Sequence, residues 1–427
     1  MSDSRRDVPA AGRDIPRAGR PTVTMIGGGQ LARMTHQAAI ALGQSLRVLA
    51  ETPSDPAAQV CADVVLGSHH NLDDLRRAAH GSHAVTFDHE GVPTEHLLAL
   101  QSEGVTVNPP PQALVYAQDK LAMRRRLTQL GAPVPEFVEV TAVADVEAFW
   151  AQVDGQVVLK AIRGGYDGRG VWLPRTLDEA LTVAAEQLDA GVPLLAERRV
   201  ALARELSAMV ARSPFGQGAT WPVVETVQRH GQCAVVIAPA PGLADAAAGR
   251  AEALALELSR ELGVVGVMAV ELFETADGEL IVNELAMRPH NSGHWSMDGC
   301  VTSQFEQHLR AVLDYPLGDT AARAPVTVMA NILGAEVAPE MPLDERLHHL
   351  MARMPDAKVH LYGKDERPDR KVGHVNIVGG PIGDPGGASD GSAFADYVAA
   401  VRERAERAAH WMATAEWTDG WNEHGME

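Results

Sequence analysis

In the first hundred positions, segments with the apolar pattern of a buried strand alternate with segments that have the apolar pattern of an amphipathic helix. Short apolar runs, which predict buried strands, are separated by longer segments with apolar residues on one helical face, such as residues 30–42. The predicted strands cover residues 23–26, 46–50, 64–66, 84–87 and 105–107. Strands that alternate with helices predict a doubly wound α/β domain with a parallel sheet. Consecutive prolines at 109–111 mark its end.

Beyond these prolines the pattern changes to α+β structure. Residues 112–130 and 392–412 are predicted to form helices. The predicted strands cover residues 157–160, 194–200, 267–273, 280–285, 326–330 and 375–378. The predicted parts are a flexible arm over 1–20, domains over 21–115, 116–324 and 325–380, and a tail over 381–427 with a glycine-rich linker, a helix and tryptophans. Trp411, Trp417 and Trp421 are costly to expose, so we expect this tail to pack on the body of the protein or on a partner subunit.

Two carboxylates face each other across one predicted hairpin. Asp277-Gly278 favours a two-residue type I′ turn, and this turn places Glu271 opposite Glu284. Like charges in that position are destabilising, and a hard cation such as Mg²⁺ would compensate them. Asn283 adds a further oxygen if the strand end twists. The alternative is two solvated glutamates on an exposed hairpin face.

A second chemical signal is an apolar strand that ends in Lys160 and leads into a glycine-rich turn over residues 164–171. Glycines allow backbone N–H groups to approach phosphate oxygens closely. Lys160 and Arg169 can neutralise phosphate charge. The spacing is not that of a P-loop, and the alternative is a tight hairpin whose glycines serve turn geometry alone.

Composition restricts the class of protein. The 427 residues are 46% hydrophobic and 22% charged, which is typical of a soluble globular chain of two to four domains. A net charge of −19 argues against a nucleic-acid partner, so anionic ligands need local basic pockets. Cys61, Cys233 and Cys300 form no metal-binding or disulfide pattern, which fits a cytoplasmic protein. No apolar run is long enough to span a membrane, and residues 1–20 do not resemble a signal peptide.

The first glycine turn supports a rival function of a different class. Residues 27–32 match the G-x-G-x-x-A pattern of dinucleotide-binding folds, and Glu51 lies where a ribose-binding acid would follow. This pattern alone favours a nicotinamide-dependent oxidoreductase. The pattern is weak, because glycine turns open many nucleotide-like folds that bind no dinucleotide.

Taken together, the motifs of this chain resemble those of the ATP-grasp ligases. The landmarks in chain order are Lys120, Lys160, residues 165–171, residues 197–200, Glu205, Glu271, Asn283 and Glu284. Four segments narrow the resemblance to the N5-carboxyaminoimidazole ribonucleotide synthetases of de novo purine synthesis, namely residues 27–34, 164–170, 288–295 and 360–374. The resemblance covers roughly residues 20–380.

The resemblance implies a fold and a reaction. The expected fold is an ATP-grasp domain with a Rossmann-like pre-ATP-grasp domain before it and a small β-rich domain after it. The expected enzyme is a carbon–nitrogen ligase that uses ATP, Mg²⁺ and bicarbonate to carboxylate 5-aminoimidazole ribonucleotide through carboxyphosphate. Its partners would be these small molecules and a second copy of the chain in a homodimer, with neither nucleic acid nor membrane.

The resemblance also assigns roles to residues. Glu271 and Glu284 would bind the metal, and Asp167, Arg288, His290 and Asn291 would be catalytic. The implied ATP-binding residues are Lys120, Lys160, Gly165, Tyr166, Asp167, Gly168, Arg169, Gly170, Val171, Glu197, Arg198, Arg199, Val200, Glu205, Gln228, Asn283 and Glu284. The implied substrate-binding residues are Tyr166, Asp167, His290, Asn291, Lys364, Arg370 and Lys371. Composition alone favours a solvated turn for the last three, since acidic residues interleave with them.

Three positions depart from the family pattern. Asp88-His89-Glu90 replaces a glutamate-phenylalanine-glutamate turn, Gln228 replaces a nucleotide-contacting histidine, and Met287 replaces a proline before Arg288. The rivals within the ligase class are a formate-dependent purine ligase and a biotin carboxylase. The segments over residues 288–294 and 364–371 separate the chain from both.

Overall fold

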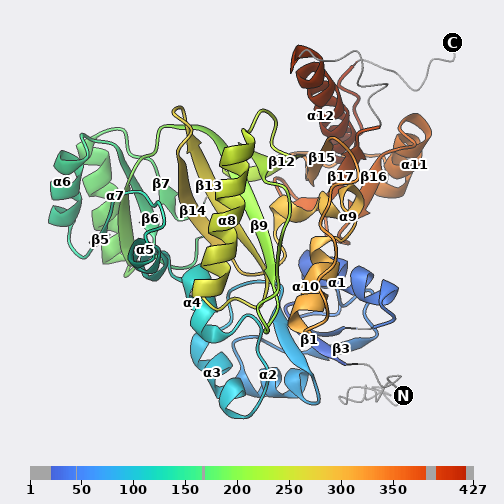
Figure 1. Cartoon of the computed structure of the whole chain (residues 1–427), viewed down its shortest axis with the longest axis horizontal. Coiled ribbons are helices and arrows are strands. Elements are labelled where there is room, and N and C mark those ends of the chain that lie inside the picture. The colour runs from blue at the N-terminus through green and yellow to red at the C-terminus, as the bar shows by residue number, and fades with distance from the viewer. Residues whose placement is uncertain (1–20, 45, 166–168, 381–390, 420–427) are drawn as a thin grey trace, which may run out of the picture. The chain divides into compact units, whose positions relative to one another are not determined.

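The computed structural model describes residues 21–44, 46–165, 169–380 and 391–419 (Figure 1). They divide into two compact units, which meet in the sequence between Val107 and Asn108. No helix within the described residues is both long enough and apolar enough to cross a membrane.

The first unit contains a parallel sheet of four strands in the order β3-β2-β1-β4. This is the predicted α/β alternation. Residues 105–107 do not form the predicted fifth strand. Val107 makes an isolated parallel bridge with Val85, and the prolines after it lack the N–H groups that would continue a ladder. The elements are β1 (Val23–Ile26), α1 (Gln30–Ala41), β2 (Arg47–Ala50), β3 (Asp63–Leu66), α2 (Leu72–Ala79), β4 (Ala84–Phe87) and α3 (Thr94–Ser102).

The second unit begins with two helices where one was predicted. Asp119 has extended backbone angles and accepts a hydrogen bond from the backbone N–H of Ala122, so it caps a new helix. The predicted single helix over residues 112–130 is therefore wrong. The result is α4 (Pro111–Gln118) and α5 (Lys120–Gln129), with Lys120 on the first turn of α5.

A small antiparallel sheet follows, with strand order β5-β8-β6-β7. Its helices contribute Val146, Phe149, Ala180 and Ala184 to a core with the buried faces of the strands. The elements are β5 (Phe137–Val140), α6 (Val143–Gln152), β6 (Val157–Ala161), β7 (Val171–Trp172), α7 (Leu177–Asp189) and β8 (Leu194–Arg198).

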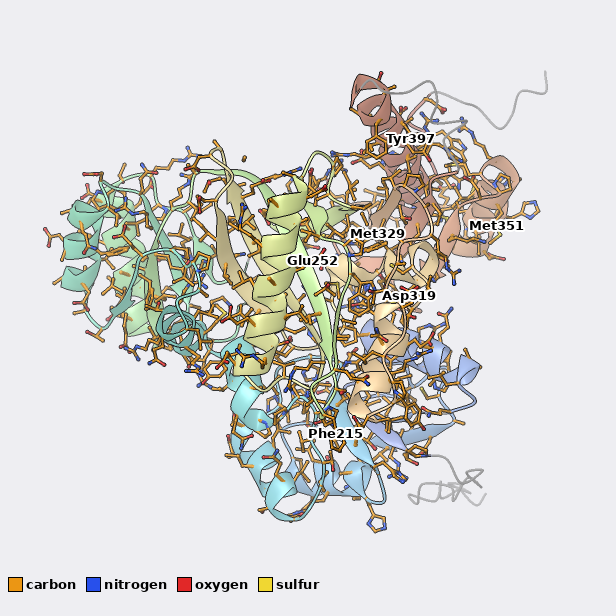
Figure 2. The ribbon with its side chains drawn as sticks, in the orientation of Figure 1. Phe215, Glu252, Asp319, Met329, Met351 and Tyr397 are labelled. Carbon is orange, nitrogen blue, oxygen red and sulfur yellow. The ribbon has the colours of Figure 1, made fainter. Side chains whose placement is uncertain are left out.

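The large sheet of this unit has nine strands, with the path β14-β13-β9-β11-β12-β15-β17-β16 and β10 paired to β9. Helix α8 (Asp245–Glu261) lies along this sheet, and its Glu252 accepts a hydrogen bond from Thr220 of β10 (Figures 1 and 2). Met329 of β15 is fully buried, whereas Phe215 in the turn after β9 is 87% exposed (Figure 2). The strands are β9 (Leu202–Arg212), β10 (Gly218–Thr220), β11 (Val224–Arg229), β12 (Gln232–Ala238), β13 (Gly266–Thr275), β14 (Leu280–Ala286), β15 (Thr327–Leu333), β16 (Lys358–Leu361) and β17 (Lys371–Val378).

The segment after residue 325 extends this sheet, because β15 pairs with β12 and β17 pairs with β15. A small domain over 325–380 was predicted, and its boundaries stay a prediction. The remaining helices are η1 (Asn291–Gly293), α9 (Ser296–Gly299), α10 (Gln304–Val312), α11 (Leu343–Arg353) and α12 (Gly391–Thr414). Trp411 and Trp417 stack with ring centroids 4.4 Å apart inside the local core, as expected of a tail that packs on the body. Trp421 lies outside the described residues.

Candidate active site

The β13–β14 hairpin pairs Glu271 with Glu284, which confirms the predicted opposition of the two carboxylates. The predicted turn is wrong. Thr275 N–H donates to the carbonyl of Glu279, and Gly278 alone of the loop residues has a positive φ, so the loop has three residues. This loop shifts the register by one position at Leu272, which pairs with Val282. A β-bulge at Asn283 reverses that shift and restores the pairing of the glutamates.

The bulge places the side chains of Asn283 and Glu284 among the same group of cations. In a regular strand, successive side chains point to opposite faces. Here the Nζ atom of Lys160 lies 3.2 Å from Oδ1 of Asn283, and the Nζ atom of Lys120 lies 3.0 Å from Oε1 of Glu284. The extra residue therefore directs two neighbouring polar side chains toward the lysines that were predicted to bind phosphate.

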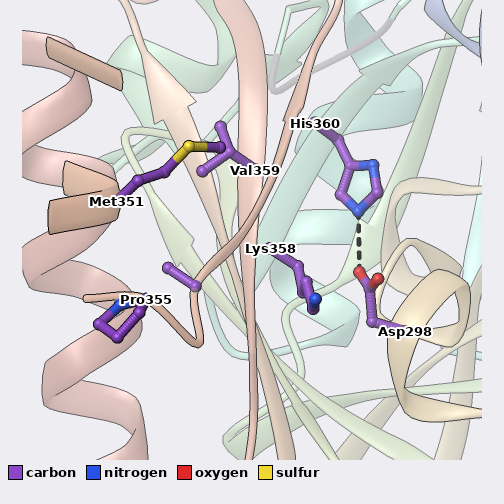
Figure 3. A pocket seen from close by; sticks show the side chains of 7 residues that line it. Asp298, Met351, Pro355, Lys358, Val359 and His360 are labelled. Carbon is purple, nitrogen blue, oxygen red and sulfur yellow. Dashed lines mark hydrogen bonds and ion pairs between the residues drawn. The ribbon is translucent and has the colours of Figure 1, made fainter. Parts of the chain in front are cut away.

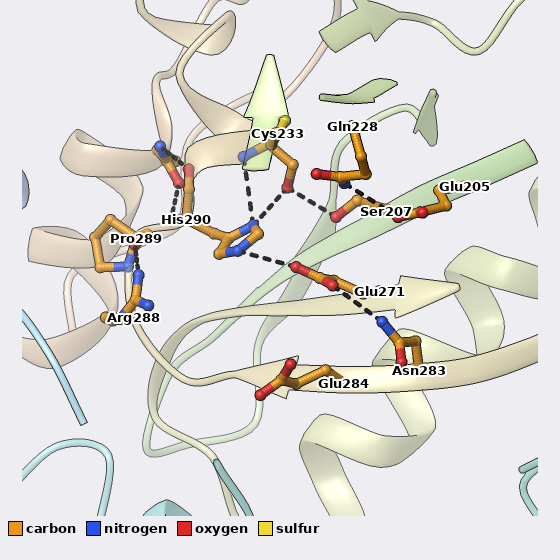
Figure 4. Close-up of polar contacts among 12 residues, drawn as sticks. Glu205, Ser207, Gln228, Cys233, Glu271, Asn283, Glu284, Arg288, Pro289 and His290 are labelled. Atoms are coloured by element: carbon orange, nitrogen blue, oxygen red, sulfur yellow. Dashed lines mark hydrogen bonds and ion pairs between the residues drawn. The ribbon is translucent and has the colours of Figure 1, made fainter. Parts of the chain in front are cut away.

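The carboxylate of Glu271 contacts the side chains of His290 and Asn283, one at each of its two oxygens (Figure 4). Nε2 of His290 lies 3.3 Å from its Oε1, and Nδ2 of Asn283 lies 3.4 Å from its Oε2. Burial acts to raise the pKa of Glu271, but the hydrogen bond and charge of His290, with the charge of Arg288 and the hydrogen bond of Asn283, together hold the pKa below its usual value. The carboxylate oxygens of Glu271 and Glu284, beside the Asn283 amide, are hard oxygen donors of the kind that fit Mg²⁺.

A buried ion-pair network lies behind Lys160. Its ammonium group is 2.7 Å from one carboxylate oxygen of Glu197, and the guanidinium of Arg124 is 2.7 Å from the other. Arg124 also donates to the backbone carbonyl of Asn283 at 2.7 Å. Burial lowers the pKa of Lys160, and the charge of Glu197 partly opposes this. Burial acts to raise the pKa of Glu197, but Lys160 and Arg124 together hold it below its usual value.

Arg124 is a residue of this site that the sequence prediction missed. It is 1% exposed and connects the bulged strand to the carboxylate that positions Lys160. The available signal was its spacing, because residues four apart lie on one face of a helix and Lys120 is four positions earlier on α5. Its partners lie 73 and 159 positions further along the chain, so sequence could not indicate them.

Glu205 and Gln228 meet on adjacent strands β9 and β11. Nε2 of Gln228 donates to Glu205 at 3.1 Å (Figure 4). Burial and the nearby charge of Glu271 raise the pKa of Glu205 above its usual value. The glutamine that replaces the family's histidine thus retains a hydrogen-bonding function here, although its predicted contact with nucleotide stays a prediction.

The loop after β14 presents His290 in a fixed orientation. Nδ1 of His290 lies 2.8 Å from the hydroxyl of Ser292, and that hydroxyl lies 2.8 Å from Ser207 on β9 (Figure 4). Gln304 of α10, also missed by the sequence prediction, contacts the backbone of His290 twice. Its Oε1 accepts from the N–H and its Nε2 donates to the carbonyl, each at 2.8 Å. Arg288 and Asn291 flank His290 in the same loop.

The glycine-rich turn connects β6 to β7, where Lys160 pairs with Val171. A Cβ atom at Gly165 would lie 2.6 Å from the carbonyl oxygen of Arg169, so this close approach requires glycine. Gly170 has φ +73°. Tyr166, Asp167 and Gly168 lie outside the described residues, and their predicted roles stay predictions.

The strand predicted over residues 194–200, whose last four residues were expected to bind ATP, ends at Arg198. The side chain of Arg198 pairs with Glu136 at 2.8 Å, and the Arg199 N–H donates to the carbonyl of Gln156 at 2.7 Å. Both contacts belong to the small sheet and its loops. The predicted contacts of residues 197–200 with ATP stay predictions.

The predicted basic segment connects β16 to β17. Lys364 lies 5.9 Å from the ring centroid of Tyr362, and Arg370 donates to the Asp365 carbonyl at 3.2 Å. Lys371 begins β17. The pKa of buried His294 is lowered mainly by burial and next by the charges of His290 and Lys371. The rings of His294 and His374 have centroids 5.0 Å apart, and Nδ2 of Asn376 donates to the carbonyl of His294 at 3.2 Å. Strand β17, which Lys371 begins, therefore packs against the loop that carries His290.

In the first unit, the N-terminus of α1 is occupied by a side chain of the protein itself. Asp88 accepts hydrogen bonds from the N–H groups of Gly29 and Ala32, each at 2.8 Å. A Cβ atom at Gly29 would lie 2.1 Å from this carboxylate. These N–H groups are the ones that a dinucleotide pyrophosphate would use, so the glycine turn here serves an internal cap.

A pocket of about 450 Å³ lies beside β16 in the second unit (Figure 3). His360 and Asp298 form a 2.8 Å ion pair on its wall. Its lining residues are Asp298, Met351, Pro355, Ala357, Lys358, Val359 and His360, none of which was predicted to bind ATP, metal or substrate.

Three family models match the chain in order. They are a ribonucleotide synthetase preATP-grasp domain over residues 21–118, an ATP-grasp domain over 125–305 and a phosphoribosylaminoimidazole carboxylase C-terminal domain over 327–383. The N5-carboxyaminoimidazole ribonucleotide synthase of Mycobacterium tuberculosis is 62% identical over 404 residues, which cover 95% of this chain and 90% of that protein. The chain belongs to the N5-carboxyaminoimidazole ribonucleotide synthase family.

Solved structures agree with this assignment. The Thermus thermophilus N5-carboxyaminoimidazole ribonucleotide synthetase matches with a TM-score of 0.77 and 36% identity, over 94% of this chain and all of that one. The Aspergillus clavatus synthase, solved with ADP and 5-aminoimidazole ribonucleotide, matches with a TM-score of 0.77 and 30% identity, over 89% and 99% of the chains. The predicted family, ligase class and ATP-grasp fold with flanking domains are thereby confirmed. The oxidoreductase, formate-ligase and biotin-carboxylase alternatives are removed.

Proposed function

We propose that the residues gathered around the β13–β14 hairpin catalyse the ATP-dependent carboxylation of 5-aminoimidazole ribonucleotide by bicarbonate. The products are N5-carboxyaminoimidazole ribonucleotide, ADP and phosphate. One observation carries the proposal: on the bulged strand β14, Lys120 donates a hydrogen bond to Glu284 and Lys160 donates one to the neighbouring Asn283. Two cations and two opposed carboxylates at one place suit a metal-bound polyphosphate.

The first step joins a bicarbonate oxygen to the γ-phosphorus of ATP while the bond from that phosphorus to the ADP oxygen breaks. Negative charge on the transferring phosphoryl oxygens must be stabilised, and catalysis is mostly positioning and electrostatics. Lys120 and Lys160 provide that charge. Glu197 and Arg124 hold Lys160 in place, so its ammonium group is oriented before the substrate arrives.

Glu271 and Glu284 would hold Mg²⁺, which the family uses with ATP and which, when bound, neutralises phosphate charge. The role of this chain is to hold the two carboxylates opposite each other. His290 and Asn283 hold the Glu271 carboxylate, and Lys120 pairs with the Glu284 carboxylate.

In the second step the exocyclic amine attacks the carboxyl carbon of carboxyphosphate, or CO₂ released from it. A carbon–nitrogen bond forms, phosphate leaves, and the amine loses a proton. Arg288, His290 and Asn291 would orient the bicarbonate and the aminoimidazole, and Asp167 would accept the proton. Lys364, Arg370 and Lys371 would bind the 5′-phosphate, which is supported by the contacts of β17, where Lys371 lies, with the His290 loop.

We further propose that the chain works as a homodimer in the cytoplasm. The support is family resemblance, together with cysteines that are all free. Sedimentation equilibrium should give twice the chain mass of 45.5 kDa.

Release of ADP with each substrate omitted in turn tests the proposed function. ADP release should require both bicarbonate and 5-aminoimidazole ribonucleotide, and neither formate nor biotin should replace them. Release that continues at the same rate without bicarbonate would contradict the assignment.

A further inference from the structure

A buried arginine connects the end of the C-terminal helix to the predicted substrate-phosphate segment, residues 363–371. Arg346 lies on α11 and is 1% exposed. Its Nη2 atom lies 2.6 Å from a carboxylate oxygen of Glu366, in the middle of that segment. Its Nη1 atom donates to the carbonyl of Met412 near the end of α12. Helix α12 lies beside β15 and β17, and α11 packs against α12 (Figure 1).

The chemistry of a helix end explains why an arginine is needed there. The last carbonyls of a helix have no partner within it, and they carry partial negative charge that favours a cation. Met412 and Ala413 lie in the last turn of α12 and are buried, so water cannot satisfy them. Arg346 reaches both carbonyls, and Trp411 returns a hydrogen bond from its Nε1 to the Arg346 carbonyl at 2.8 Å.

The same guanidinium fixes a segment that is otherwise largely exposed. Gly363, Asp365, Arg367, Pro368 and Asp369 are all exposed. On the β15 side, the N–H of Gly334 donates to the carbonyl of Arg370 at 2.9 Å, and its own carbonyl accepts from Asp369 at 3.0 Å. A Cβ atom at Gly334 would lie 2.1 Å from the Arg367 carbonyl oxygen. The segment is therefore anchored by Gly334 at one side and by Arg346 through Glu366 at the other.

We propose that Arg346 is a positioning residue for the ribotide substrate, which acts through Glu366 to set the position of Lys364, Arg370 and Lys371. Helix α12, which lies entirely beyond the end of the last matched family domain at residue 383, is thereby part of the substrate-binding structure. A phosphate monoester on the substrate is the group whose binding depends on this contact. The inference rests on the proposed function, because it assumes that the segment binds that phosphate.

Steady-state kinetics of matched variants test the proposal. Glu366→Gln keeps the size of the side chain and removes its charge, and Arg346→Met removes the cation. Each should raise KM for 5-aminoimidazole ribonucleotide roughly ten-fold and leave KM for ATP within about two-fold. The double variant should show the same KM for the ribotide as each single variant, because either substitution alone already breaks the Arg346–Glu366 contact.

Arg353→Met is the matched control. Arg353 is on the same helix, but its guanidinium lies 4.1 Å over the ring of Trp417 and pairs with Asp419. It should lower thermal stability without changing KM for the ribotide. An Arg353 variant that raises this KM as much as Arg346→Met, or a Glu366→Gln enzyme with unchanged KM, would overturn the proposal.

A variant of the segment itself separates this inference from the proposed function. If Lys371→Met raises KM for the ribotide while Glu366→Gln does not, the positioning role alone is wrong. If Lys371→Met also leaves this KM unchanged, the segment does not bind the phosphate and both assignments fail.

Discussion

At the scale of single residues, the site depends on one inserted position in a strand. Asn283 is the extra residue of a bulge, and it contacts Lys160, Glu271 and, through its carbonyl, Arg124. The bulge lets neighbouring side chains serve one cluster, as bulges beside active sites commonly do. Each of the opposed glutamates has partners that offset the repulsion, namely His290 and Asn283 for Glu271 and Lys120 for Glu284.

Glu284→Ala should abolish magnesium-dependent ADP release and leave the fold intact. The substitution removes one of two carboxylates available to the metal and releases Lys120 from its partner. ADP release against Mg²⁺ concentration measures the first effect, and circular dichroism checks the fold. Glu279→Ala, an exposed position on the same hairpin, is the control and should keep full activity. Normal turnover in Glu284→Ala would refute the metal assignment.

Arg124→Met should reduce both stability and activity. Removing one member of a buried ion-pair network costs about 3–5 kcal/mol in unfolding free energy, and loss of the Asn283 carbonyl contact should lower kcat roughly ten-fold or more. Urea unfolding and steady-state kinetics measure the two effects.

Arg125→Met provides the comparison for this variant. Arg125 is the next residue on α5, is 57% exposed and pairs with Glu139 at the surface. Its loss should change the unfolding free energy by about 0.5 kcal/mol or less. If the two substitutions changed the unfolding free energy equally, the buried network would contribute no more to stability than a surface ion pair.

At the scale of elements, a buried histidine joins α10 to the start of β13. His308 is fully buried, and its Nδ1 accepts from the N–H of Val267 at 3.1 Å. A Cβ atom at Gly266 would lie 2.9 Å from the imidazole, so the contact is close. Burial lowers the pKa of His308 to about 3.

This low pKa predicts acid sensitivity. The folded state keeps His308 neutral, whereas in the unfolded chain this histidine binds a proton below about pH 6.5. Proton binding favours the unfolded chain, so the free energy of unfolding decreases as pH falls from 6.5 toward 3. Between pH 7 and pH 5 this group should cost about 2 kcal/mol of unfolding free energy.

Urea unfolding of His308→Gln at both pH values tests this linkage. Glutamine can still accept from Val267 but does not titrate, so the loss of stability on going to pH 5 should be about 2 kcal/mol smaller than in the wild type. His410→Gln, at an exposed position on α12, should behave like the wild type. An unchanged pH dependence in His308→Gln would contradict the prediction.

The elements also show where sequence reasoning succeeded and where it failed. The apolar period identified β1, β2, β4, β6 and both hairpin strands, because burial alone dictates such runs. The break at Asp119 was missed because nothing in the sequence distinguishes an aspartate that caps a new helix from one within a continuous helix. Glu271 and Glu284 were paired correctly although the turn was wrong, since the loop and the bulge shift the register in opposite directions.

At the scale of the whole molecule, an acidic chain concentrates cations where anionic ligands are expected. The net charge is −19, yet Lys120, Lys160 and Arg124 lie around one hairpin. Motifs in sequence order were enough to predict the family, the module order and most of the proposed site. Arg124, Gln304 and Arg346 could not be predicted, because each acts through partners distant in the sequence or on backbone atoms.

The central claim is that this chain transfers the γ-phosphoryl group of ATP to bicarbonate. Turnover in bicarbonate labelled with oxygen-18 tests it most directly, with mass spectrometry of the released phosphate. Attack by a bicarbonate oxygen on phosphorus predicts that each phosphate carries one bicarbonate oxygen and that label appears with ADP in equal amounts. Phosphate free of label, formed at the rate of ADP, would contradict the account.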